Sequence, residues 1–186
     1  AQPLSVQIHP ADDDPALADD ESGKPEAWYV LHAEPGAGLY LGFLDDVDET
    51  AVRDAIRRGD DVSALLRFIE VAPGDYFAID AGTPHAIGPG LTLLEPQRVL
   101  PGKRGLTYRY WDWNRTYDAS GAPAAGGSPR ELHLERALAV TRWDALQVSA
   151  NAHRLEDYGQ ARLEVLETAT PGGLGLARLS GSGEVV

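Results

Sequence analysis

Residues 76–90 read YFAIDAGTPHAIGPG, and this stretch carries the clearest structural signals of the chain. Its first half alternates apolar residues, which predicts a half-buried strand. Gly82 and Pro84 then restrict the backbone directly before His85. A histidine held by such turns has a defined direction, as a metal ligand requires. The alternative is a surface loop that carries an incidental histidine.

Composition limits the classes of protein that fit. The chain has 186 residues, 43% of them hydrophobic, which suits one domain with its own core. It lacks cysteine, so a bound metal would have to be held by His, Asp, Glu or amide oxygen. The net charge of -13 disfavours nucleic acid and anionic membranes as partners. No run suggests a membrane helix or a signal peptide, and we expect a cytoplasmic protein.

One stretch runs against the acidic composition. Residues 98–115 contain a single acid, Asp112, and five basic side chains: Arg98, Lys103, Arg104, Arg109 and Arg115. This local excess of positive charge is compatible with a small anionic substrate. Residues 12–21 hold six acids and are interpreted as a solvated loop or short helix.

Short strands dominate the rest of the pattern. Asp48 has the character of an N-cap for a helix that runs through Arg58 and ends at Gly59, and a helical turn follows over 61–66. We therefore expect a small helical insertion at 45–66, a flexible loop at 118–130 and a helix at 131–140. The strands are expected at 3–9, 27–32, 39–44, 67–72, 76–80, 91–97, 106–115 and 162–166. Many short strands with regular turns predict a mainly β protein, either a sandwich or a barrel.

Four polar residues on separate predicted strands could meet in the lumen of a jelly-roll barrel. Gln7 and His9 share one face of the first strand, Glu26 stands at the mouth of the next, and His85 follows the turn described above. Two imidazoles, a carboxylate and an amide oxygen suit zinc, and iron, manganese or cobalt could also fit. A hydrogen-bonded polar patch on a sheet is the alternative that spacing alone leaves open.

Several motifs together resemble one family. They are LSVQIHP at 4–10, GKPEAWY at 23–29, PGDYFAI at 73–79, GTPHAIGPGLTLLE at 82–95, TYRYWDWNR at 107–115 and ELHLE at 131–135. In this order they are similar to type I mannose-6-phosphate isomerase, a zinc enzyme with a cupin-type jelly-roll (double-stranded β-helix) barrel. The resemblance spans residues 3 to about 145. It implies that residues 1–186 form a single cupin-type domain with one Zn2+ per chain.

The resemblance also implies site residues. The family's metal ligands fall on Gln7, His9, Glu26 and His85, and its active-site arginine falls on Arg109. Catalytic or substrate-binding roles are expected for Arg109, Lys24, Glu95 and Ser5, of which Lys24 and Glu95 are alternative bases and Ser5 is a phosphate-binding candidate. Lys24 could instead bind phosphate, and Arg109 could form a structural ion pair with Asp112 or Glu95.

The implied reaction interconverts mannose 6-phosphate and fructose 6-phosphate through an enediol(ate). It requires a base, a group that stabilises the developing oxyanion, and a grip on phosphate. A cupin that binds a sugar or sugar phosphate without turnover, or one of different specificity, is the alternative. Family members extend beyond both ends of the matched region, so we expect a piece of a longer protein. The oligomeric state is open, and a monomer fits the sequence.

Overall fold

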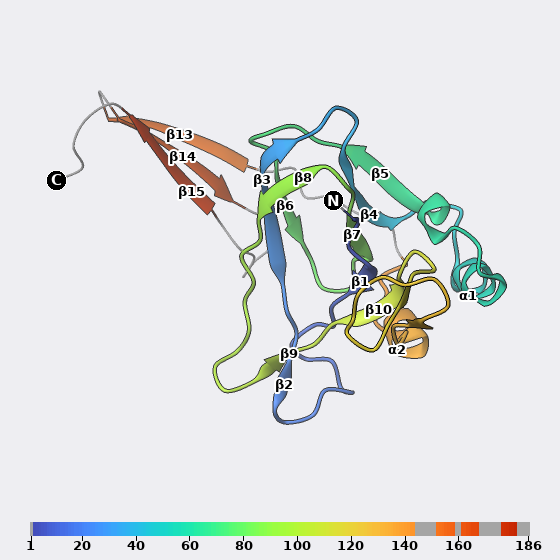
Figure 1. The fold of residues 1–186 in the computed structure, drawn as a ribbon. Helices are drawn as coiled ribbons and strands as arrows, with labels where there is room; N and C mark the ends of the chain where they lie inside the picture. Colours follow the sequence, from blue (N-terminus) through green and yellow to red (C-terminus); the bar gives the residue numbers. More distant parts are fainter. Residues whose placement is uncertain (1, 144–151, 159–160, 168–175, 182–186) are drawn as a thin grey trace.

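The computed structural model describes residues 2–143, 152–158, 161–167 and 176–181. Two antiparallel sheets face one another in the main body (Figure 1). The larger has the order β10-β1-β7-β4-β5, with β1 (Val6–Ile8), β4 (Gly38–Phe43), β5 (Leu66–Glu70), β7 (His85–Ile87) and β10 (Tyr108–Trp111). The smaller has the order β6-β3-β8, with β3 (Glu26–Ala33), β6 (Tyr76–Ile79) and β8 (Leu91–Leu94). Every expected strand from 3–9 to 106–115 therefore overlaps a strand of these two sheets.

Two apolar cores lie on the two faces of the larger sheet. The interior core joins the sheets and is built from Trp28, Val30, Leu39, Leu41, Val71 and Ile79. The second core lies between the larger sheet and the helices, and it includes Val6 and Ile8 of β1. Because side chains alternate along a strand, Val6 and Ile8 point to the helices while Ser5, Gln7 and His9 share the opposite side. The polar face predicted for this strand is thus the interior face of the barrel.

The helical insertion lies within the predicted range. Helix α1 (Glu49–Arg58) begins after Asp48, whose carboxylate accepts a hydrogen bond from the Ala51 amide. It ends at Gly59, which adopts a left-handed conformation with φ 74°. The short 3₁₀ helix η1 (Val62–Leu65) follows. Val52, Ala55 and Val62 belong to the second core, so the insertion packs on the outside of the barrel and leaves its interior free.

Helix α2 (Leu134–Ala139) is shorter than the helix expected at 131–140. Its buried residues Ala137 and Leu138 join the second core, and Tyr110 of β10 donates a hydrogen bond to the Ala137 carbonyl over 2.9 Å. Residues 131–133 are outside the helix because two of them bind the edge of β10, as described below. Tertiary contacts thus decide where this helix begins.

Smaller pairings complete the described structure. β2 (Glu21–Ser22) pairs in parallel with β9 (Arg104–Gly105), and β11 (Thr116–Tyr117) pairs with β12 (Ser128–Pro129). β12 lies inside the segment 118–130, whose flexibility stays a prediction. β13 (Ala152–Tyr158), β14 (Ala161–Glu167) and β15 (Leu176–Gly181) form a further antiparallel sheet, and β14 contains the strand expected at 162–166. Among the described residues, no helix has the length and apolar character needed to cross a membrane.

Candidate metal centre

Three of the four predicted ligands meet inside the barrel. His9 Nε2 lies 3.1 Å from one carboxylate oxygen of Glu26, and His85 Nε2 lies 3.3 Å from the other. The ligand atoms of all three residues lie within 4.8 Å of one another. Each residue is at most 2% exposed. The arrangement therefore excludes the alternative of an incidental surface histidine at position 85.

Strand order explains how residues so distant in sequence converge. β1 and β7 are neighbours in the larger sheet, with Gln7 directly opposite His85, while Glu26 begins β3 in the facing sheet. The turn before β7 is tied to the first strand, because the Gly82 amide donates a hydrogen bond to the His9 carbonyl over 2.9 Å. Gly82 has φ 79°, and a Cβ there would lie 2.9 Å from the Val140 carbonyl oxygen. Glycine is thus required where the predicted turn positions His85.

Both histidines are oriented by backbone carbonyls. Nδ1 of His9 donates to the Leu106 carbonyl over 2.9 Å, and Nδ1 of His85 donates to the Thr83 carbonyl over 2.8 Å. A carbonyl can only accept, so each neutral ring carries its proton on Nδ1 and turns the lone pair of Nε2 towards Glu26. Such second-sphere hydrogen bonds are typical of histidines that bind metals.

The buried polar atoms of this cluster need a cation. His9 Nε2, His85 Nε2 and Glu26 Oε1 are buried without a hydrogen-bond partner. Burial lowers the pKa of His9, which favours its neutral ring. Lone pairs that face a carboxylate repel it unless a positive charge lies among them. The donor set of two imidazoles and one carboxylate therefore fits a divalent cation such as zinc.

Gln7 occupies the position expected of a fourth ligand on the same wall. It lies directly opposite His85 on one side and Arg109 on the other. Directly opposed residues of neighbouring strands point to the same side of a sheet, so Gln7 shares the interior face with both. Its side chain is nearly buried, at 8% exposure. Its role as a ligand stays a prediction.

The two candidate bases differ in position. Lys24 Nζ lies 3.5 Å from Glu26 Oε2, at the partly open side of the cluster, with 15% of its side chain exposed. Glu95 is exposed and reaches the cluster only through Gln97, whose amide donates to Glu95 over 3.0 Å and to Glu26 over 3.2 Å. No motif of the sequence indicates Gln97, because its contact with Glu26 depends on an isolated bridge between the two residues.

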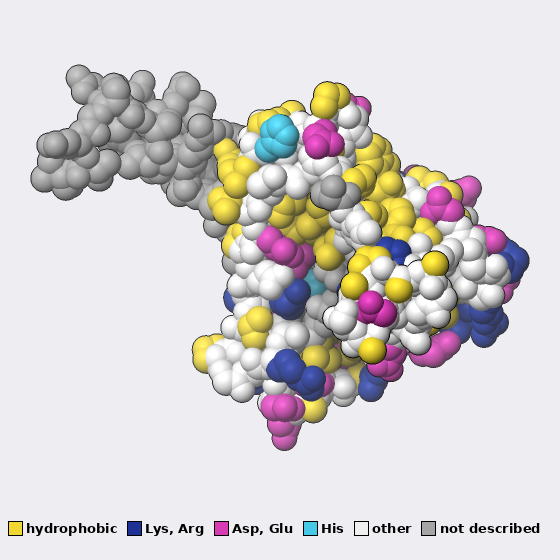
Figure 2. All heavy atoms as spheres, viewed as in Figure 1, with side chains coloured by type: hydrophobic (Ala, Val, Ile, Leu, Met, Phe, Trp, Pro, Cys, Tyr) yellow, Lys and Arg dark blue, Asp and Glu magenta, His cyan; other side chains and the backbone are white. Residues whose placement is uncertain are grey.

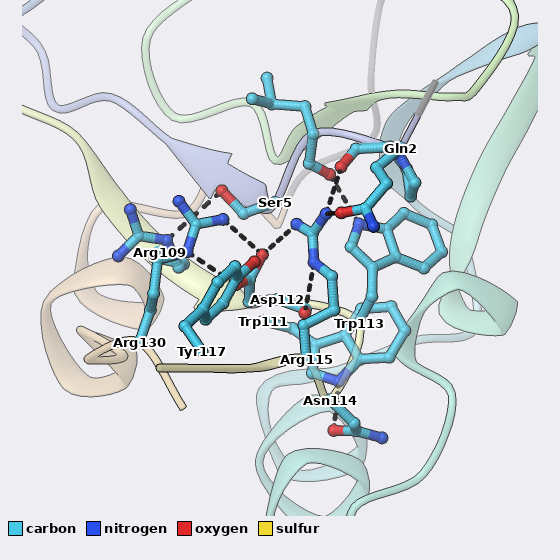
Figure 3. Close-up of polar contacts among 12 residues, drawn as sticks. Gln2, Ser5, Arg109, Trp111, Asp112, Trp113, Asn114, Arg115, Tyr117 and Arg130 are labelled. Atoms are coloured by element: carbon cyan, nitrogen blue, oxygen red, sulfur yellow. Dashed lines mark hydrogen bonds and ion pairs between the residues drawn. The ribbon is translucent and has the colours of Figure 1, made fainter. Parts of the chain in front are cut away.

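Arg109 is held by neutral groups. Its Nε lies 3.4 Å from the buried hydroxyl of Ser5 (Figure 3). Its Nη1 donates to the Glu131 carbonyl over 3.0 Å. Burial lowers the pKa of Arg109, and the neighbouring Arg130 adds to this effect. Neither Asp112 nor Glu95 is among its hydrogen-bonding partners, so the alternative of a structural ion pair for Arg109 was wrong.

Asp112 instead binds two other arginines. Its carboxylate accepts hydrogen bonds from Arg130 over 2.6 and 2.7 Å, from Tyr117 over 2.8 Å, and from Arg115 (Figure 3). Arg115 also donates to the Pro3 carbonyl, so this network ties the N-terminal segment to the end of β10. Arg130 lies outside the basic stretch recognised in the sequence. Its glycine- and proline-rich surroundings gave no indication of this contact.

The acidic and basic stretches of the sequence neutralise one another in part. Arg98 pairs with Asp12 over 2.5 Å, and Arg104 pairs with Glu21 over 2.6 Å. Residues 12–20 therefore form a loop, Glu21 begins β2, and two acids of the run serve as counter-charges. Figure 2 shows a hollow in the middle of the viewed face, where a histidine lies near basic and acidic side chains.

Curated relatives of the chain point to one family. It is 34% identical over 159 residues to mannose-6-phosphate isomerase ManA of Bacillus subtilis, covering 84% of this chain and 46% of that protein. It is 36% identical over 137 residues to mannose-6-phosphate isomerase of Streptococcus mutans, covering 74% of this chain and 39% of that protein. The chain thus spans less than half the length of these relatives. No family profile matches it.

Solved structures agree on the fold. The crystal structure of the mannose 6-phosphate isomerase from Bacillus subtilis matches with a TM-score of 0.72 at 27% identity, over 89% of this chain and 48% of that chain. A putative mannosephosphate isomerase from Archaeoglobus fulgidus matches with a TM-score of 0.58 at 24% identity, over 89% of this chain and 47% of that one.

Fold and site together define a class. Two antiparallel sheets that enclose a buried His-Glu-His cluster make this a mainly β, cupin-type jelly-roll protein with an interior suited to a metal ion. Within that class the chain belongs to the mannose-6-phosphate isomerase family.

Proposed function

We propose that this chain carries the metal-binding barrel of a zinc-dependent isomerase that interconverts mannose 6-phosphate and fructose 6-phosphate. The observation that carries the proposal is the buried His9–Glu26–His85 cluster, in a chain whose relatives are named mannose-6-phosphate isomerases. The substrate would be a small phosphosugar, in keeping with the acidic composition, which disfavours nucleic acid and membranes. We also propose a cytoplasmic location, where such a phosphosugar would be found.

His9, Glu26 and His85 would hold the zinc ion, with Gln7 as the fourth protein ligand. A bound zinc ion would polarise the carbonyl of the open-chain sugar. The carbonyls of Leu106 and Thr83 keep both Nε2 atoms directed at the metal position, so the ligands need little rearrangement to bind.

Arg109 would stabilise the negative charge that develops as the substrate loses a proton beside its carbonyl. Its register opposite Gln7 supports this role, because both residues then face the barrel interior. Its contacts with Ser5 and Glu131 orient the guanidinium without cancelling its charge. A full positive charge in a partly buried site stabilises an oxyanion more strongly than it would in water.

Lys24 is the better placed of the two proposed bases. Its amine contacts Glu26, whereas Glu95 is connected to the cluster through Gln97. Proton transfer requires a group within hydrogen-bond reach of the substrate carbon that bears the proton. Glu95 would then act by orienting the Gln97 amide, which also contacts Glu26. Ser5, buried beside Arg109, would contribute a hydroxyl to the anionic end of the substrate.

The test is isomerase activity under control of metal content. Protein loaded with zinc should convert mannose 6-phosphate to fructose 6-phosphate, lose this activity on dialysis against a chelator and regain it with zinc. Activity that survives complete removal of metal would contradict the mechanism. Stabilisation by mannose 6-phosphate without turnover would favour the non-catalytic sugar-binding alternative.

A further inference from the structure

No second strand covers the outer edge of β10 at Arg109 in the part of the chain that the structure describes. β10 is an edge strand of its sheet and pairs with β1, with Gln7 opposite Arg109. An edge strand directs alternate amides and carbonyls away from the sheet, where they need other partners. The backbone amide and the backbone carbonyl of Arg109 both bind His133. Its amide donates to Nδ1 of His133 over 3.1 Å, and its carbonyl accepts from the His133 amide over 2.8 Å.

His133 therefore takes the place of a neighbouring strand. Its imidazole accepts from the Arg109 amide, and its backbone amide donates to the Arg109 carbonyl. The same short segment also binds the guanidinium, because the Glu131 carbonyl accepts from Nη1 of Arg109 over 3.0 Å. Three hydrogen bonds thus join residues 131–133 to Arg109, two to its backbone and one to its side chain. All three groups on the segment are neutral, so they fix the arginine in place without forming an ion pair with it.

The position of His133 in its own element supports a dedicated role. It is the N-cap residue of α2, a position where side chains commonly bind the helix amides, yet it makes no such capping bond. Its imidazole instead accepts the hydrogen bond from the Arg109 amide. Because Nδ1 accepts from an amide, the neutral ring carries its proton on Nε2, the opposite tautomer from His9 and His85. α2 itself is anchored by buried Ala137 and Leu138, which gives the segment a rigid base.

We propose that His133 is a positioning residue, which closes the edge of β10 and holds the Arg109 guanidinium at the reacting end of the substrate. This inference rests on the proposed function for its effect on catalysis. It predicts that loss of the Nδ1 acceptor affects turnover more than substrate binding or metal content, because a shift of the charged group by about 1 Å weakens its effect on the transition state.

The experiment compares His133→Ala with His133→Asn, whose Oδ1 offers an acceptor near the position of Nδ1. His32→Ala, at an exposed position of β3, is the matched control for loss of a histidine. With mannose 6-phosphate as substrate, we expect His133→Ala to lower kcat by about tenfold or more. KM should stay within about twofold and zinc content should be unchanged, and the asparagine variant should recover most of kcat. Equal losses in the alanine and asparagine variants, or a loss no greater than that of His32→Ala, would overturn the proposal.

A second measurement separates this proposal from the proposed function. NMR of the native protein should find His133 as the Nε2–H tautomer, and the Arg109 amide should exchange its hydrogen faster in His133→Ala than in His133→Asn. If the native protein does not isomerise mannose 6-phosphate, the proposed function fails, and these two signals still decide whether His133 holds Arg109. A native His133 protonated on Nδ1, or equal exchange of Arg109 in both variants, would refute the contact itself. The tautomer can be read even if His133→Ala does not fold.

Discussion

At the scale of single residues, the candidate centre depends on which atoms are left without a protein partner. The carbonyls of Leu106 and Thr83 bind one nitrogen of each histidine, and the other nitrogen is thereby directed at Glu26. Buried atoms that can only accept hydrogen bonds do not stabilise one another. The same geometry that would destabilise a purely structural cluster is the geometry that a metal ion stabilises.

His85→Ala should remove metal and activity together. The imidazole is fully buried and supplies one of three converging ligand atoms, so we expect affinity for zinc to fall by at least about 100-fold. Metal analysis after dialysis and calorimetric titration with zinc measure this loss. His32→Ala should bind zinc as the native protein does. Stoichiometric, tightly bound zinc in His85→Ala would show that residue 85 is not a ligand.

Acid should destabilise the metal-free protein. The pKa of His9 is lowered by burial, so below about pH 6.5 the unfolded chain takes up a proton that the folded ring resists, and stability falls. Thermal unfolding of the metal-free protein between about pH 8 and about pH 5 measures this loss. In His9→Asn the loss should be smaller, and an unchanged profile would contradict the assignment to His9.

At the scale of elements, the Asp112 network joins segments that lie far apart in the sequence. Through Arg115, Arg130 and Tyr117 the carboxylate connects the end of β10 with the N-terminal segment and with the region after β12 (Figure 3). Trp113 adds a hydrogen bond to the Leu4 carbonyl over 2.7 Å. The segment that leads into β1, and hence to Ser5 and Gln7, is held from one side by this network.

Asp112→Asn should lower the free energy of unfolding by about 2 kcal/mol. The carboxylate is almost fully buried and its charge is shared by two guanidinium groups, but Arg130 is itself 41% exposed, which keeps the loss below that of a wholly buried pair. Denaturant unfolding measures the change. Asp45→Asn, which breaks the exposed pair with Arg67, is the matched control and should cost less than about 0.5 kcal/mol. Equal effects in the two variants would mean that the network adds no more than a surface ion pair.

At the scale of the whole molecule, the candidate centre bridges the two sheets. His9 and His85 come from the larger sheet and its margin, while Glu26 begins β3 of the smaller sheet, so a cation held by all three would clamp the barrel across its interior (Figure 1). The interior core beneath it contributes Trp28, whose ring meets that of His85 edge to face at 5.4 Å. Metal binding and barrel stability should therefore be linked.

Zinc should raise the melting temperature of the native protein. A free zinc concentration about 100 times the dissociation constant adds about 2.7 kcal/mol of stability, which corresponds to a rise of roughly 5–10 °C for a chain of this size. Scanning calorimetry with and without zinc measures the shift. His85→Ala should show little or none. A shift of the same size in that variant would place the stabilising metal elsewhere.

Sequence alone determined the local structure and the candidates for the site. Residue periodicity predicted the strands, and Asp48 and Gly59 marked both ends of α1, because caps and alternation act over a few residues. The motifs also identified His9, Glu26 and His85 as residues that could meet.

Tertiary structure decided the rest. Only the pairing of β1 with β7 and the facing of β3 bring the three side chains together, and only the carbonyls of Leu106 and Thr83 select the tautomers. Contacts over such separations carry no local sequence signal, since each depends on where another part of the chain lies. The same reason explains why the sequence did not show that Asp112 pairs with Arg115 and Arg130 and not with Arg109.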